Sequence, residues 1–203
     1  MEEFTGYRVP VTRDRIDQWL SRFDAADQDV ASRLLDAVLF VSSSDVTIAF
    51  RAILASLDGW ALSEDDRRGR WMFVPFSGSA GESGDHMLER FRRANNLKGR
   101  KYSNLFCYRS DLVEREPGPK DTVVFVDDFS GTGDQACAAW KLMFQELLPL
   151  RPRVLLVLLA ASNVAQGRIA TETSMKACAH IDLSSDEDIF SAQCESILRR
   201  RKG

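Results

Sequence analysis

In the first seventy residues, apolar side chains recur at intervals of three and four positions. The positions are Ile16, Trp19, Leu20 and Phe23, then Val30, Leu34, Val38 and Val41, and then Val46, Phe50, Ile53, Leu54 and Leu57. This period matches the turn of an α-helix, so the pattern predicts three amphipathic helices. A charged connector follows at residues 64–70. We therefore expect an N-terminal helical extension over residues 1–70.

Beyond residue 70 the pattern changes to short apolar runs that alternate with amphipathic stretches. Strands are predicted at residues 71–76, 104–108, 123–126, 154–160 and 179–183, and helices at residues 85–95, 136–147, 164–176 and 189–198. Strands that alternate with helices are typical of a parallel sheet covered by helices. The sequence thus predicts an α/β domain with a parallel sheet over residues 71–203.

Residues 121–135 are the most informative stretch, because they join a strand, two acids and a glycine-containing loop. Four consecutive apolar residues precede the acids and indicate a strand covered on both faces. Asp127 and Asp128 follow at its carboxyl end, the edge where open α/β sheets bind ligands. Gly131 and Gly133 allow backbone conformations in which successive N–H groups face one anion. The stretch therefore predicts a phosphate site beside two carboxylates.

This stretch resembles the phosphoribosyl pyrophosphate (PRPP) signature of type I phosphoribosyltransferases. It reads Val-Phe-Val-Asp127-Asp128-Phe-Ser-Gly-Thr132-Gly133-Asp134-Gln135. With Phe129, Gly131 and the segment at residues 83–88, it is similar to the phosphoribosyltransferase-like proteins of bacterial conflict (anti-phage) elements. The resemblance implies a Rossmann-like parallel sheet and a transferase that acts at C1 of ribose, that is, a glycosyltransferase.

The resemblance also implies a role for each residue of the signature. Asp127 and Asp128 are expected to hold the ribose hydroxyls and Mg²⁺, which would arrive with PRPP. The 5′-phosphate is expected in the loop formed by Ser130, Gly131, Thr132, Gly133, Asp134 and Gln135.

A second loop and a cation complete the expected site. Residues 77–84 are rich in glycine and serine, a composition that suits a backbone anion site. In the resemblance this is the pyrophosphate loop, and the expected contacts are Ser77, Gly78, Ser79 and Gly81. A positive charge is expected from Arg109, Arg115 or Lys120, and we favour Arg109 because it follows a predicted strand end. The expected catalytic residues are therefore Asp127, Asp128 and Arg109.

Three departures from the family pattern leave two hypotheses open. Gly131 stands where some purine-salvage relatives carry an acid that acts on the base, Asp134 adds a negative charge beside the expected phosphate, and the loop at residues 77–84 has no Lys or Arg. One hypothesis is an enzyme that acts on PRPP or a nucleotide. The other is a non-catalytic sensor that binds the same ligand and passes its state to a protein partner through the N-terminal helices.

Composition excludes several other classes of protein. The net charge of −3 argues against a nucleic-acid-coating surface. The basic clusters at residues 90–101 and 199–202 are more typical of solvated helix faces, and a nucleic-acid-associated module that uses the first cluster is a weaker third hypothesis. The longest apolar run is far too short for a membrane helix. The N-terminus has no secretory signal, so we expect a cytoplasmic protein.

The remaining features are less informative. Cys107, Cys137, Cys178 and Cys194 are too widely spaced for a zinc site or a disulfide framework. The base or acceptor and the oligomeric state are left open, a homodimer being one option. The conflict-element relatives extend beyond the last predicted helix, so the sequence leaves open whether this chain is a shortened form that lacks part of an acceptor pocket.

Overall fold

The computed structural model describes residues 11–76 and 83–183. Their Cα positions form two compact units that divide between Val46 and Thr47. The expected boundary at residue 70 stays a prediction. The helix predicted at residues 189–198 and the loop residues 77–82 lie outside the described residues. Within the described part, no helix combines the length and apolar character that crossing a membrane requires.

The three predicted N-terminal helices are present. They are α1 (Arg13–Leu20), α2 (Gln28–Ala37) and α3 (Ser43–Ser56), and α3 crosses the division between the two units. At the start of α3, the backbone N–H of Ser42 donates to Asp45 at 2.8 Å, and the N–H of Asp45 donates to the Ser42 hydroxyl at 3.2 Å. This reciprocal pair satisfies donors that a helix start leaves unpaired.

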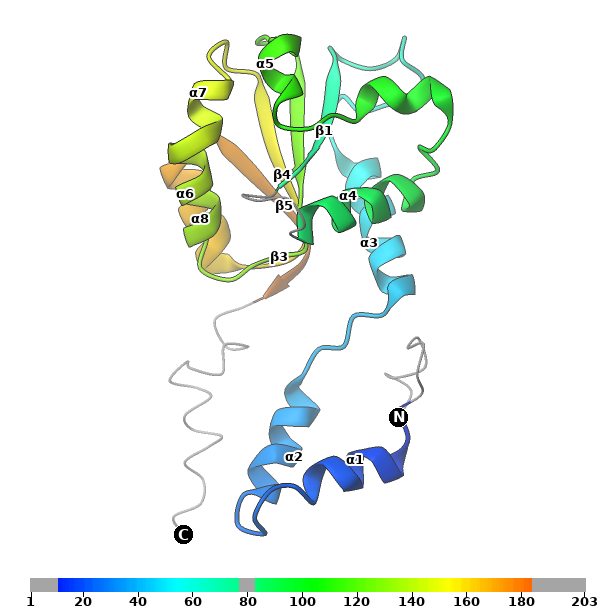
Figure 1. The fold of residues 1–203 in the computed structure, drawn as a ribbon, viewed down its shortest axis with the longest axis vertical. Coiled ribbons are helices and arrows are strands. Elements are labelled where there is room, and N and C mark those ends of the chain that lie inside the picture. Colours follow the sequence, from blue (N-terminus) through cyan, green and yellow to red (C-terminus); the bar gives the residue numbers. More distant parts are fainter. Residues whose placement is uncertain (1–10, 77–82, 184–203) are drawn as a thin grey trace. The chain divides into compact units, whose positions relative to one another are not determined.

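A parallel sheet forms the centre of the second unit, which confirms the α/β class (Figure 1). Its strands are β1 (Trp71–Pro75), β2 (Thr122–Val126), β3 (Phe129–Ser130), β4 (Arg153–Ser162) and β5 (Met175–Leu183). β2 lies between β1 and β4, and β4 also pairs with β5 and with the short β3. All residues of β1 and β2 are buried, as expected for strands covered on both faces.

The strand predicted at residues 104–108 is wrong. A 3₁₀ helix, η2 (Arg100–Leu105), occupies most of this region, and only Phe106 forms a bridge, parallel to Phe73. Nearby side chains form hydrogen bonds with backbone groups that a strand would use to pair with its neighbour. The carbonyl of Asn104 accepts a hydrogen bond from Arg115 at 2.7 Å, and the N–H of Tyr108 donates to Asp111 at 2.9 Å. Such side-chain bonds compete with a ladder.

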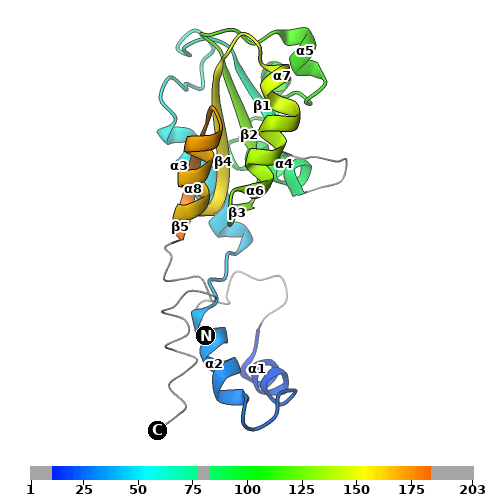
Figure 2. The ribbon, with the colours of Figure 1, turned by 90° about the vertical axis from the view of Figure 1, so that its left-hand side faces the viewer.

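Helices cover both faces of the sheet (Figures 1 and 2). On one face lie α5 (Asp111–Arg115), α6 (Asp134–Ala139), the π-helix η3 (Trp140–Phe144), α7 (Gln145–Leu147) and α8 (Asn163–Glu172). Phe144 from η3 packs on Phe125 of β2 with ring centroids 4.2 Å apart. On the other face, Phe91 of α4 (Ser83–Ala94) lies between Phe73 of β1 and Phe50 of α3.

The chain reverses its direction across the sheet between β1 and β2. α4 follows β1 on one face and leads to Phe106, which bridges the free edge of β1 because β2 occupies the other edge. α5 then packs Leu112 into the core of the opposite face before β2 begins. In open α/β sheets, ligands bind beyond the carboxyl ends of the strands at such a reversal. The fold therefore predicts a ligand site beyond the carboxyl ends of β1 and β2.

Candidate functional site

β1 and β2 end side by side at the reversal point. Pro75 is in register with Val126, and the N–H of Phe76 donates to the carbonyl of Val126 at 3.0 Å. The loop predicted to bind pyrophosphate and the PRPP signature therefore leave the sheet from adjacent positions. Four of the predicted contacts, namely Ser77, Gly78, Ser79 and Gly81, lie outside the described residues, so their role stays a prediction.

The two acids of the signature occupy different environments. Asp127 is only 5% exposed, and its carboxylate accepts a hydrogen bond from the N–H of Asp128 at 3.0 Å. Asp128 is half-buried, and its carbonyl accepts hydrogen bonds from Leu159 and Ala160 of β4 at 2.9 and 3.1 Å. β4 therefore fixes the backbone of the acid pair.

These acids fit a magnesium ion only if the ligand supplies most of its coordination. Across residues 11–76 and 83–183, no group of three or more His, Cys, Asp or Glu side chains could hold a metal by itself. Magnesium usually keeps several waters and binds through one or two carboxylates and substrate phosphates. Asp127 and Asp128 match that limited role.

The loop after the acids is held in a defined shape. The hydroxyl of Ser162 donates to the carbonyl of Gly131 and accepts a hydrogen bond from the N–H of Ala165 at 2.9 Å. Gly133 has φ = +77°, and a Cβ there would lie 3.2 Å from the carbonyl oxygen of Ala165. The end of β4 and the start of α8 therefore support the loop, and the backbone at position 133 favours glycine.

The loop contains backbone donors that are unused. Among the described residues, the N–H groups of Thr132 and Gly133 donate to no acceptor. Gly133 is buried, and α6 begins at Asp134 directly after it. Adjacent unpaired N–H groups before a helix are a suitable arrangement for binding an anion.

Asp134 does not leave an uncompensated negative charge beside this loop. Its carboxylate accepts hydrogen bonds from the Thr132 hydroxyl, at 2.7 Å, and from the guanidinium of Arg168 on α8. The Thr132 hydroxyl and then Arg168 lower the pKa of Asp134. Arg168 also pairs with Glu172 at 2.7 Å, and Glu172 pairs with Lys141 at 2.7 Å. A charged network therefore joins the loop to α8.

Sequence reasoning missed Arg168. It lies 34 residues after Asp134, in a helix whose apolar pattern is weak, and no local motif connects the two positions. The remaining signature residue, Gln135, is exposed at the start of α6.

The predicted catalytic cation contacts the π-helix η3 rather than the signature loop. Arg109 is half-buried, and its guanidinium lies 2.8 Å from the sulfur of Met143 in η3. Met143 follows Asp134 by nine residues, roughly 14 Å along a helix. The alternative cation Arg115 donates to Asn104, and Lys120 is exposed. The structure therefore does not bring Arg109 to the loop, and its catalytic role stays a prediction.

Among the described cysteines, Cys107 and Cys137 are buried and Cys178 is half-buried. Burial raises the pKa of Cys107 to about 11. Burial also raises the pKa of Cys137, at the start of α6, and of Cys178 on β5. Raised values disfavour the thiolate, so these three residues are poor nucleophiles.

The comparison with protein families agrees with the signature. The chain matches the model of the PRTase-CE family over residues 16–202. No curated protein matches it. Among solved structures it is similar to orotate phosphoribosyltransferase from Aeropyrum pernix, with 17% identity, a TM-score of 0.42 and coverage of 70% of this chain and 72% of that chain. Because the family model spans nearly the whole sequence, the chain belongs to the PRTase-CE family, the phosphoribosyltransferases of conflict elements.

Proposed function

We propose that this protein binds a 5-phosphoribosyl ligand, PRPP or a nucleotide, beyond the ends of β1 and β2 and makes or breaks a bond at C1 of the ribose. One observation carries the proposal. Asp127 and Asp128 follow β2, where the topology reverses, and they directly precede a loop whose Thr132 and Gly133 N–H groups are unused in the described chain. A ligand that carries a diol and a phosphate would bind the carboxylates through the diol and the N–H groups through the phosphate.

The acids would orient and stabilise the ribose. Carboxylates accept hydrogen bonds from the 2′- and 3′-hydroxyls, and their negative charge favours the oxocarbenium-like transition state of bond cleavage at C1. Asp128 is the more accessible of the two, whereas Asp127 is nearly buried and held by the N–H of Asp128. We therefore assign direct contact mainly to Asp128. When bound with PRPP, Mg²⁺ would neutralise the pyrophosphate charge.

The loop would hold the 5′-phosphate. The Thr132 and Gly133 N–H groups would donate to the phosphate oxygens, and hydrogen bonds to an ionised acceptor are stronger than neutral ones. The support from Ser162 means that the loop need not be ordered on binding. Preorganised donors of this kind raise affinity by reducing the entropic cost.

Calorimetry with Mg-PRPP and a panel of nucleoside monophosphates tests this function. The double variant Asp127→Asn/Asp128→Asn should lose at least tenfold in affinity. A matched control is Asp65→Asn/Asp66→Asn, another adjacent acid pair with the same change of charge, which is exposed in the connector. The control should bind like the parent protein. Equal affinities in the parent and the signature variant would refute the proposal.

A second candidate is the non-catalytic sensor, and two observations favour it. Arg109, the expected catalytic cation, contacts Met143 rather than the signature loop. The side chains of Trp19, Phe23 and Leu34 in the first unit are 36–38% exposed, which leaves apolar surface for a protein partner. An assay for pyrophosphate released from Mg-PRPP, or for base released from a nucleotide, separates the two functions. Turnover that depends on Asp128 would exclude the sensor.

The family name suggests the biological setting. Membership of PRTase-CE associates the chain with conflict elements, and we place its activity in anti-phage defence. Cells that carry its complete genetic element should reduce phage plaque numbers, and Asp128→Asn should remove that protection at equal protein level. Unchanged protection by this variant would show that defence does not depend on the signature site.

A further inference from the structure

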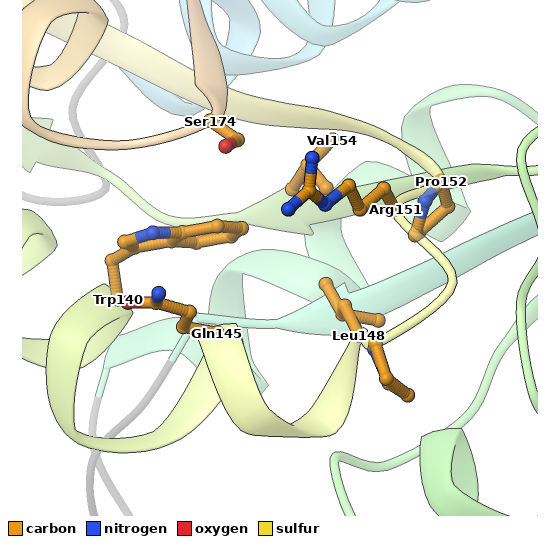
Figure 3. Close-up of a pocket in the computed structure, with 8 residues that line it drawn as sticks. Trp140, Gln145, Leu148, Arg151, Pro152, Val154 and Ser174 are labelled. Carbon is orange, nitrogen blue, oxygen red and sulfur yellow. The ribbon is translucent and has the colours of Figure 1, made fainter.

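A pocket lies beside the start of β4 (Figure 3). Its volume is ≈ 420 Å³, and the residues that line it include Trp140, Gln145, Leu148, Arg151, Val154 and Ser174. Val154 is the second residue of β4, whereas the signature loop contacts Ser162 at the end of this strand. These positions are eight residues apart, about 26 Å along a strand. The pocket is therefore separate from the candidate phosphoribosyl site.

The pocket combines an apolar wall with polar groups. Trp140, Leu148 and Val154 are buried and come from the core of the second unit. Gln145 and Ser174 are exposed beside them. The side chain of Arg151 extends toward Trp140, with Ser174 nearby (Figure 3). Such a surface suits a ligand with an apolar body and one polar end.

The guanidinium of Arg151 is unused in the described part of the chain. It forms no hydrogen bond or ion pair there, whereas the nearby Arg153 bonds to Thr122 and to the carbonyl of Asp58. An arginine that lines a pocket without a carboxylate partner can bind an anion with several donors at once.

The backbone holds Arg151 in an unusual conformation. Its φ is +52°, a left-handed value that a non-glycine residue rarely adopts, and it directly precedes the buried Pro152. A single hydrogen bond closes the turn, from the N–H of Arg151 to the carbonyl of Leu148 at 3.1 Å. The opposite wall belongs to the π-helix η3, a type of element frequently found at functional sites. Irregular backbone therefore forms two sides of the pocket.

We propose that this pocket binds a small planar carboxylate, an aromatic or heteroaromatic acid whose ring packs against Trp140 and whose carboxylate is held by Arg151. A guanidinium presents two parallel donors that match a carboxylate. An aromatic ring gains from contact with the indole and with Leu148. A phosphate dianion fits less well, because only one arginine and no lysine line the pocket in the described part of the chain. This site is independent of the proposed phosphoribosyl function.

Titration of ¹⁵N-labelled protein with benzoate tests the proposal. The chain has four tryptophans, so the spectrum has four indole N–H signals, and loss of one signal in Trp140→Phe assigns Trp140. Benzoate should move the Trp140 signal saturably. Benzamide, which has the same shape without the charge, should bind at least tenfold more weakly.

Arg151 variants complete the test. Arg151→Gln and Arg151→Gly should each weaken benzoate binding at least tenfold, and the glycine variant should fold normally because glycine readily adopts positive φ. Arg100→Gln, an exposed arginine on η2, is the control and should bind like the parent protein. The proposal is overturned if no saturation occurs up to about 10 mM benzoate, if benzamide binds equally well, or if Arg151 and Arg100 variants behave alike.

Discussion

The guanidinium of Arg168 donates a hydrogen bond to the carboxylate of Asp134. This contact joins α8 to Asp134, which belongs to the signature loop and is also the first residue of α6. It places a positive charge beside a negative one at the expected phosphate site. The acid that makes this signature unusual is thereby neutralised locally, and Arg168 becomes a positioning residue for the loop.

Replacing Arg168 should therefore weaken phosphate binding. In Arg168→Gln, Asp134 keeps its charge without its partner and repels the ligand, so we expect affinity for Mg-PRPP or a nucleotide to fall by about threefold, the modest effect of an exposed ion pair. Adding Asp134→Asn should restore the affinity. Calorimetry on both single variants and the double variant measures the coupling. Additive losses, with no restoration, would show that the pair does not act through charge.

The ion pair between Asp121 and Arg70 should make stability depend on pH. Asp121 accepts hydrogen bonds from Arg70 at 2.6 Å and from the N–H of Gly118 at 2.8 Å, and its side chain is 10% exposed. Burial alone would raise the pKa of Asp121, but these hydrogen bonds outweigh it and hold the pKa below its ordinary value. A lowered pKa stabilises the fold above the unfolded-state value of about 3.9, and this stabilisation is lost as the pH falls through the folded-state pKa.

Asp121→Asn should accordingly reduce the free energy of unfolding by about 2 kcal/mol at pH 7, the usual scale for hydrogen bonds to a charged group. The difference from the parent protein should shrink as the pH falls below about 4. Urea unfolding at a series of pH values measures it. The control is Asp58→Asn. The side chain of Asp58 pairs with Arg68 and is 71% exposed, so this change should lower the free energy of unfolding by less than about 1 kcal/mol. A loss for Asp121→Asn that is equal at pH 3 and pH 7 would contradict this account.

Two glycines should respond in opposite ways to alanine. At Gly133, φ = +77° and the carbonyl of Ala165 at 3.2 Å oppose a Cβ, so Gly133→Ala should destabilise the fold by about 1–2 kcal/mol. Gly167 lies within α8, where an added Cβ would meet no atom within 4 Å, so Gly167→Ala should stabilise the fold by about 0.5–1 kcal/mol. Thermal unfolding of both variants provides the comparison. Stabilisation by Gly133→Ala would show that the loop is less constrained than its geometry indicates.

Much of the sheet could be predicted because its strands are strongly apolar. β2 and β4 contain runs of buried residues that hardly fit another element, and the acids after β2 mark its end. The prediction of a strand at residues 104–108 is wrong. The apolar side chains there are typical of a strand, but the carbonyl of Asn104 bonds to Arg115 and the N–H of Tyr108 bonds to Asp111. Side-chain bonds of this kind leave no periodic signal in the sequence.

The site was predictable to the extent that it is contiguous in the sequence. Asp127, Asp128 and the loop through Gly133 lie within seven residues, so one motif contains them. The supports of that loop, Ser162 and Arg168, come from the end of β4 and from α8, and they become neighbours only in the folded chain. The same is true of the pocket around Arg151, whose walls come from separate elements.

A crystal structure of the protein with Mg-PRPP or a nucleoside monophosphate tests the central claim most directly. The account predicts that the 5′-phosphate accepts hydrogen bonds from the N–H groups of Thr132 and Gly133, with the ribose hydroxyls on Asp128 and Asp127. A ligand bound elsewhere, or a phosphate that makes no contact with this loop, would contradict it.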